Sequence, residues 1–166
     1  HAPFYSFYSN FLKQAGYSTT EIGFLWAVGV MAEIIMFAIA HIFFKRFSWR
    51  LMVSICLILT ALRWFMGGSF PQIFAIQFFA QTIHAFSFGL FHLIAMRIIF
   101  QNFSLGQQGR GQALYSTMWG LGVASGSILA GHYWHSLSGE HIFILAGCAV
   151  LLGLGFVRYL PKEVQA

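Results

Sequence analysis

The sequence contains no aspartate, and only 8% of its 166 residues are charged. A soluble globular domain carries about 25% charged residues, so the composition excludes that class. Hydrophobic residues make up 58% of the chain, and the mean hydropathy is +0.73. The composition therefore predicts an integral membrane protein. Because no period-two alternation is sustained along its several apolar runs, we expect it to be all-α and polytopic.

Cysteine is scarce as well. Cys56 and Cys148 lie in separate apolar runs without redox or metal-site spacing, so we interpret both as small buried hydrophobic residues. The sequence has no P-loop, no Cys-x-x-Cys pair, no nucleophile elbow and no zinc-protease motif. Nothing in it indicates bond-making chemistry, and we expect neither an enzyme nor a bound cofactor.

Among the residue types that commonly bind metals, histidine is the most frequent in the sequence. His132, His135 and His141 gather between the last two apolar runs, but their spacing is irregular and no carboxylate pattern accompanies them. This pattern is weak for a metal site, and we predict none. A membrane haem or quinone protein, with ligands among His41, His84 and His92, remains a remote alternative.

The apolar runs are long enough to be membrane helices. Residues 22–44 form one such run, and at about 1.5 Å per residue a helix of that length crosses a bilayer core. The predicted helices are residues 2–12, 22–44, 51–70, 73–100, 113–135 and 141–159. The first is too short to span a membrane, and we expect it to lack its start.

The basic residues predict how these helices are oriented. The chain has nine lysines and arginines, and seven fall on one side of the predicted helices: Lys45, Arg46, Arg50, Arg97, Arg110, Arg158 and Lys162. Basic residues favour the cytoplasmic side, so residues 45–50, residues 101–112 and the C-terminus are expected there. Because these cations form no basic stripe, the net charge of +5 does not indicate a nucleic-acid partner.

Three ionisable residues fall at middle depth in the predicted helices. Glu33 is centred in residues 22–44, roughly 16 Å from either end, and Arg63 and His84 lie inside the next two helices. Such groups cost several kcal/mol in a bilayer by most estimates and usually face a bundle interior or a wet cavity. Together they favour a functional site, although a structural salt bridge with a satisfied histidine stays open as the alternative.

Helical phase at 100° per residue gives further candidates on the same faces. Helix 73–100 presents a stripe of Gln77, Gln81, His84, Phe88 and His92. Tyr5 and Tyr8 share a face of the first helix, and Trp26, Glu33 and Phe37 share a face of the second. In the fifth helix, Gly122, Gly126 and Ala130 have the small-residue spacing that allows close helix packing.

Four stretches carry a resemblance to a known family. They are "HAPFYSFYSNFLKQAGYSTTEIGFLWAVGVMAEIIMFA", "LRWFMGG", "IHAFSFGLFHLIAMRIIF" and "QALYSTMWGLG". The chain resembles the C-terminal six-helix half of a major facilitator superfamily transporter, and most of all the bacterial phenylpropionic acid transporter family, relatives of lactose permease and the nucleoside symporters. The resemblance implies that residues 1–166 are helices seven to twelve of a twelve-helix transporter, whose N-terminal half completes a midplane cavity.

The resemblance also suggests residue roles. Arg63 matches a buried arginine of lactose permease, and His84 matches a histidine that is followed three residues later by a proton-handling glutamate. Here Ser87 stands at that later position, so the permease's proton site is absent as such. Glu33 matches, to within about a turn, a sugar-binding acid of the permease.

These observations lead to a functional expectation. The protein is expected to be a proton-coupled symporter in the bacterial inner membrane for a small organic solute, such as the aromatic acid 3-phenylpropionate. Glu33, Arg63 and His84 would couple protons to transport, and the substrate would meet Tyr5, Tyr8, Trp26, Phe37, Gln77, Gln81 and His92. A nucleoside or sugar symporter of the same fold is the alternative, since Arg63 then need not meet an anion.

Overall fold

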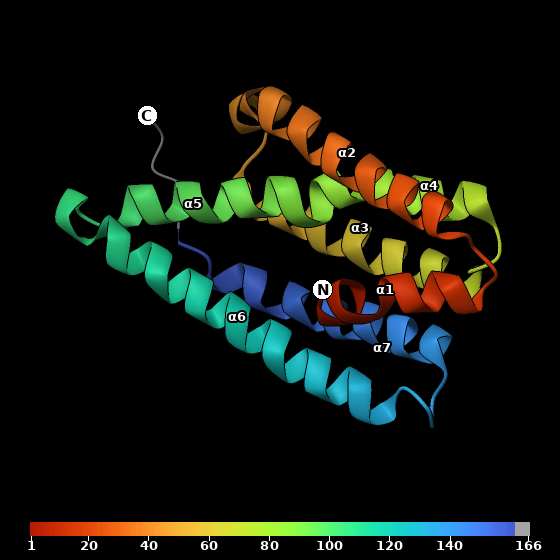
Figure 1. Ribbon diagram of the computed structural model, residues 1–166. Helices are drawn as coiled ribbons and strands as arrows, with labels where there is room; N and C mark the ends of the chain where they lie inside the picture. Colours follow the sequence, from red (N-terminus) through yellow and green to blue (C-terminus); the bar gives the residue numbers. More distant parts are fainter. Residues whose placement is uncertain (162–166) are drawn as a thin grey trace.

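A computed structural model describes residues 1–161, and all regular elements in that part of the chain are helical (Figure 1). The elements are α1 (Ala2–Gln14), α2 (Thr19–Arg46), α3 (Trp49–Ser69), α4 (Phe74–His84), the π-helix η1 (Ala85–Leu90), α5 (Phe91–Asn102), the 3-10 turn η2 (Leu105–Gln107), α6 (Gln108–Tyr133), α7 (Gly139–Leu152) and the 3-10 segment η3 (Gly153–Tyr159). Helix α4 continues through η1 into α5, and α7 continues into η3. The all-α prediction is confirmed, with the six helices in the predicted order.

Local sequence signals explain where several helices begin and end. Ser18 and Glu21 form a capping box at the start of α2, with each side chain accepting a hydrogen bond from the other residue's backbone N–H. Ser48 caps α3 in the same manner by accepting from the N–H of Leu51. Helix α1 ends before Gly16, whose φ of +96° is a left-handed conformation that glycine adopts without strain.

Four helices are long and apolar enough to cross a membrane: Thr19–Arg46, Trp49–Ser69, Phe74–Asn102 and Gly139–Tyr159. Helix α1 has 13 residues and is short, as predicted. Helix α6 has 26 residues but is not among the four, because glycine, serine and glutamine dilute its apolar side chains. Its membrane crossing, predicted for residues 113–135, stays a prediction.

The connections alternate between the two ends of the bundle. The α2–α3 and α5–α6 connections lie at the left end of Figure 1, and the others lie at the right end. At the left end, the indole N–H of Trp49 donates to the carbonyl of Pro161 at 2.9 Å, and Arg50 donates to that of Leu160 at 2.6 Å. The last described residues are therefore anchored beside the α2–α3 turn. Lys162 and the C-terminus, predicted to be cytoplasmic, lie outside the described residues.

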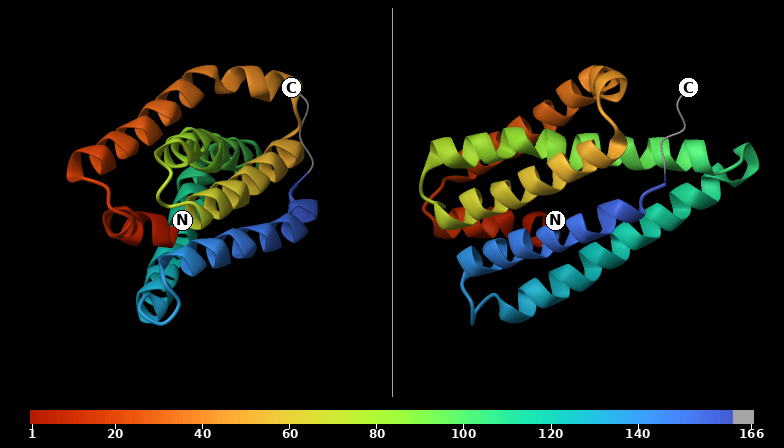
Figure 2. Two further views of the ribbon diagram at one scale, coloured as in Figure 1. Left: turned by 90° about the vertical axis from the view of Figure 1, so that its right-hand side faces the viewer. Right: turned by 180° about the vertical axis from the view of Figure 1, so that it is seen from behind.

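Two apolar clusters form the core. The first joins α1 to parts of α2, α3, α6 and α7 and includes Phe4, Trp64 and Phe143. The second joins α2, α3, η1 and α5 and includes Met36, Trp49, Cys56, Ala85 and Ile94. Helices α3 and α7 pack side by side, as do α2 and the α4–η1 helix (Figure 2). Arg63 adjoins Trp64 and His84 adjoins Ala85, so the buried polar residues lie where the two clusters meet.

The small residues of α6 differ in their surroundings. Gly126 faces α1 so closely that a Cβ atom there would stand 2.6 Å from the Cβ of Ala2, and Ala130 is buried. No atom lies within 4 Å of the corresponding position at Gly122. Cys148 also differs from expectation: Cys56 is buried as predicted, but Cys148 is exposed because it lies on the outer side of α7.

Candidate functional site: a buried arginine relayed to a carboxylate

Arg63 of α3 occupies the centre of the site and is only 1% exposed. Its Nη1 donates to Nδ1 of His84 at 2.7 Å and to Oγ of Ser87 at 3.1 Å. Its Nη2 donates to Oε1 of Gln81 at 3.2 Å. All three acceptors come from the helix formed by α4 and η1. A buried guanidinium has to be hydrogen-bonded, and this one is bonded along a single neighbouring helix.

Aromatic rings surround the same guanidinium. Its central carbon lies 4.2 Å from the ring centroid of Phe4 and 4.4 Å from that of Trp64. Cation–π contacts of this kind contribute about 2 kcal/mol or more when the site is desolvated. Phe4 was not among the candidates from the sequence. Its only sequence signal is its place one turn before Tyr8 on the first helix.

His84 connects the arginine to a carboxylate on α2. Its Nε2 lies 2.6 Å from Oε1 of Glu33, on the ring edge opposite the arginine. An arginine N–H only donates, so Nδ1 of His84 acts as the acceptor. The neutral imidazole therefore carries its proton on Nε2, and this N–H donates a hydrogen bond to Oε1 of Glu33. The order Arg63, His84, Glu33 brings together all three ionisable residues that the sequence singled out.

Solvent reaches this row of hydrogen-bonded residues from one end. The side chain of Glu33 is 17% exposed, whereas that of His84 is 5% exposed. Gln81 and Ser87, which also contact the arginine, are buried. Glu33 is thus the most accessible of the three residues in the order Arg63, His84, Glu33.

The π-helix η1 begins directly after His84. It contains Ser87 and Phe88, and the helix resumes α geometry before His92. The ring of Phe88 stacks between the two imidazoles, with centroids 5.7 Å from His84 and 5.9 Å from His92. The wider turn of a π-helix keeps residues four apart aligned on one side of the helix. This alignment explains why the rings of His84, Phe88 and His92 stack in one row. Nδ1 of His92 lies 3.3 Å from the hydroxyl of Tyr115 on α6, not at the arginine.

The amide stripe predicted on α4 faces the protein interior. Gln77 donates through Nε2 to the carbonyls of Gly67 and Phe70, and its Oε1 accepts from the hydroxyl of Tyr8 at 3.3 Å. Both Gln77 and Gln81 are buried, and so is Tyr8. Gln81 hydrogen-bonds Arg63, whereas Gln77 bonds to Tyr8 and to backbone carbonyls. Direct contact of these three predicted substrate-binding residues with a substrate stays a prediction.

The remaining predicted substrate-binding residues lie closer to the surface. The indole N–H of Trp26 donates to Oγ of Ser9 at 3.0 Å, and its ring packs on Phe4. Phe37 is 45% exposed and lies near Gly89. Tyr5 is 41% exposed and contacts the ring of Trp119, a residue that the sequence analysis missed.

Trp119 completes an accessible aromatic surface beside the charged chain. Its ring centroid lies 5.5 Å from that of Phe88, which in turn stacks on His84. Tyr5, Phe88 and Trp119, here called the open ring cluster, come from three different helices. Helical phase within one helix does not predict contacts between rings of different helices. The tryptophan in the glycine-rich stretch "WGLGVASG" is the sequence signal that could have indicated Trp119.

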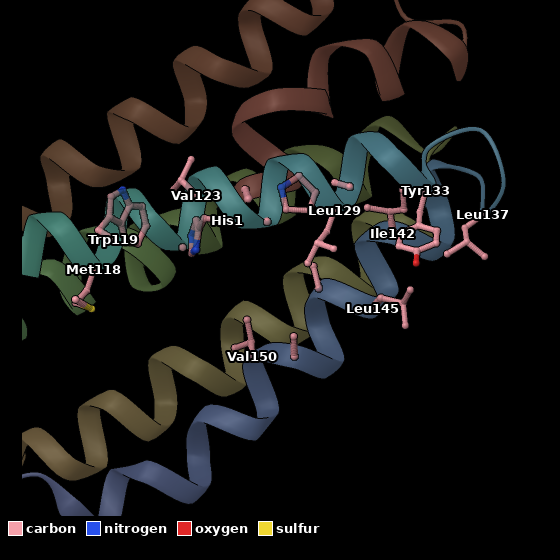
Figure 3. Close-up of a pocket in the computed structure, with 17 residues that line it drawn as sticks. His1, Met118, Trp119, Val123, Leu129, Tyr133, Leu137, Ile142, Leu145 and Val150 are labelled. Carbon is pink, nitrogen blue, oxygen red and sulfur yellow. The ribbon is translucent and has the colours of Figure 1, made fainter.

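A separate apolar groove opens between α6 and α7 at the start of α1 (Figure 3). Its volume is about 600 Å³, and its lining includes His1, Trp119, Gly122 and Gly126. Trp119 therefore belongs both to the lining of this groove and to the open ring cluster. Among the described residues, no group of three histidine, cysteine or acidic side chains is placed to hold a metal ion.

Comparison with known proteins identifies the family. Residues 1–145 match the MFS_1 like family. The chain belongs to that family. It is also 33% identical over 174 aligned residues to a probable 3-phenylpropionic acid transporter of Escherichia coli (strain K12). That alignment covers 100% of this chain and 42% of the relative, in its C-terminal part, so the chain spans less than half the length of that protein. No solved structure matches the chain.

The match explains the architecture. The MFS_1 like family is a family of major facilitator transporters, which are multi-pass membrane proteins, and four helices of this chain are long and apolar enough to cross a membrane. Its six helices correspond to the C-terminal half of the twelve-helix major facilitator fold. In that fold the small-molecule pathway runs between the two halves.

Proposed function

We propose that residues 1–166 form the C-terminal half of a proton-coupled symporter for a small organic anion. The observation that carries the proposal is the buried, hydrogen-bonded order Arg63, His84, Glu33, which ends at an accessible carboxylate. A fixed positive charge, a neutral relay and a group able to bind a proton are the parts that such coupling needs. Buried acids in membrane helices commonly serve proton relays.

The proposed coupling follows from the hydrogen bond at Nε2 of His84. When Glu33 is ionised, it accepts this bond and balances the charge of Arg63. When Glu33 takes up a proton, its carboxyl group no longer provides that negative charge. A substrate carboxylate then replaces it as the acceptor, because a buried arginine is costly without an anion. Proton and anion are therefore bound together and released together.

An aromatic carboxylic acid such as 3-phenylpropionate fits this arrangement. Its carboxylate would accept from His84, and its ring would pack on the open ring cluster of Tyr5, Phe88 and Trp119. Phe88 stacks directly on His84, so an apolar surface begins one ring away from the proposed anion position. The relative named as a probable 3-phenylpropionic acid transporter supports this choice.

The location and partner of the chain follow from the same proposal. Lys45, Arg46, Arg50 and Arg110 lie at one end of the bundle, which we place on the cytoplasmic side of a bacterial inner membrane. A second six-helix half would close the substrate cavity over Glu33 and the open ring cluster. Protons and the organic anion are the transported partners.

Competition experiments test the substrate class. In cells that express the complete transporter, unlabelled 3-phenylpropionate should inhibit uptake of the labelled acid, whereas a nucleoside or a neutral sugar should not. Inhibition by those neutral solutes with equal effect would favour a nucleoside or sugar symporter and contradict the anion role proposed for His84 and Arg63.

A further inference from the structure

Gly29 lies on the face of α2 that packs against α4. A Cβ atom at this position would stand 2.9 Å from Oε1 of Gln81 and 3.5 Å from Cδ2 of His84. A Cβ carbon does not pack as close as 2.9 Å to a side-chain oxygen, so any side chain at residue 29 would move either α2 or the glutamine amide.

The amide of Gln81 is not free to move aside. Gln81 is 1% exposed, and its Oε1 accepts a hydrogen bond from Nη2 of Arg63. Turning the amide away would leave a buried guanidinium N–H without an acceptor, and such unsatisfied groups are strongly disfavoured. The displacement would therefore fall largely on α2.

Gly29 also shares a helix face with Glu33. Residues four apart in an α-helix lie one above the other, so these two approach α4 together. In the imidazole of His84, Cδ2 is bonded to Nε2, the atom that contacts the carboxylate. The glycine and the carboxylate thus meet the same edge of one ring.

From this geometry we infer that Gly29 is a positioning residue for proton coupling. Its missing side chain allows α2 to approach α4 closely enough for Glu33 to accept the hydrogen bond of His84. A side chain at residue 29 holds Glu33 away from the imidazole, so the Glu33 carboxylate and the substrate carboxylate no longer compete for the hydrogen bond of His84, and proton binding is uncoupled from anion binding. The inference rests on the proposed symport and adds the residue that sets the α2–α4 distance.

The test compares two glycines of the same helix in the complete transporter. Gly29→Ala should lower the number of protons moved per substrate and reduce uphill accumulation about tenfold, the order of effect expected from a small misplacement. Exchange of internal for external substrate, which needs no proton release, should continue. Gly23→Ala is the matched control, because no atom lies within 4 Å of a Cβ at residue 23. It should behave as the wild type.

A second background tests whether the clash with Gln81 is the cause. In Gln81→Ser the side chain ends before the position of Oε1, so adding Gly29→Ala should change coupling much less there than in the wild type. If Gly29→Ala alone fails to reach the membrane, comparing Gln81→Ser with and without Gly29→Ala still tests the inference. Wild-type proton coupling in Gly29→Ala overturns the inference. If Glu33→Gln also retains coupling, the proposed function fails with it, so the two failures are distinguishable.

Discussion

Nε2 of His84 lies 2.6 Å from Oε1 of Glu33, and the same imidazole accepts a hydrogen bond from Arg63 through Nδ1. One neutral ring thereby links a fully buried cation to a half-buried acid on another helix. In lactose permease, which the chain resembles, a proton-handling glutamate follows three residues after the histidine that matches His84. Here Ser87 stands at that position and accepts from Arg63, while the carboxylate comes from α2.

Replacing Glu33 by glutamine should separate accumulation from exchange. The amide cannot bind and release a proton, so uphill accumulation should fall to the equilibrium level, while exchange across the membrane continues. Both are measured with labelled substrate in cells with and without an energy source. Glu140→Gln is the control, because Glu140 is exposed at the start of α7. A loss of accumulation in both variants would contradict a specific role for Glu33.

Replacing Arg63 by lysine should weaken substrate binding although the charge is kept. A lysine ammonium cannot reproduce the planar set of bonds to His84, Ser87 and Gln81. Without these bonds His84 is no longer held with its Nε2 N–H toward the anion. Losing that one charge-assisted hydrogen bond to the substrate, about 1.5 kcal/mol, predicts a rise of roughly tenfold in the half-saturation concentration. An unchanged concentration for uptake would show that the guanidinium geometry has no part in binding.

The open ring cluster should determine preference for aromatic acids. Trp119→Leu keeps an apolar side chain but removes the ring that contacts Tyr5 and Phe88. Aromatic contacts contribute about 0.5–1.5 kcal/mol beyond area burial, so the preference for 3-phenylpropionate over hexanoate should fall about three- to tenfold. Competition of the two acids for uptake measures it. An equal loss for both acids would indicate a structural role for Trp119.

Transport of one anion with one proton should be electrically neutral. Uptake into vesicles should then respond to an imposed pH gradient and not to an imposed potassium diffusion potential. A potential is worth about 2.3 kcal/mol per charge per 100 mV, so net charge movement would be readily detected. Potential-driven uptake would require a second proton site outside the three residues described here.

The close approach of α1 to α6 should be sensitive to side-chain size. Gly126→Val would place new atoms against Ala2, which already lies 2.6 Å from a Cβ at residue 126. Overpacking of this kind costs typically about 1–3 kcal/mol, so the melting temperature of the detergent-solubilised protein should fall. Gly122→Ala serves as the control, since its Cβ has open space. Equal melting temperatures for both variants would contradict the packing at Gly126.

The sequence predicted the order of the helices and the three ionisable residues that the structure brings together, for clear physical reasons. Ionisable groups are so disfavoured in a bilayer that Glu33, Arg63 and His84 stand out without any structure. Helical phase alone did not reveal that His84 lies between the other two, because that order depends on how α2 and α3 pack against α4. It placed Gln77 and Gln81 correctly beside His84, but those amides turn inward to carbonyls and to Arg63.

Other features depend on contacts between distant segments. The π-helix η1 has no local sequence signature, and it aligns Phe88 between two imidazoles. Trp119 reaches Phe88 only because α6 returns beside the η1 region. The spacing of Gly122 and Gly126 predicted close helix packing for both, yet of these two only Gly126 lies close to another helix. Such differences arise from tertiary packing, which a pattern within one helix does not contain.

The most direct test records external pH while 3-phenylpropionate enters sealed vesicles that contain the complete transporter, with no gradient imposed. The account predicts alkalinisation of the medium as the acid enters with a proton, and no alkalinisation with Glu33→Gln. Entry of labelled acid into wild-type vesicles without any pH change, or alkalinisation that persists with Glu33→Gln, would contradict it.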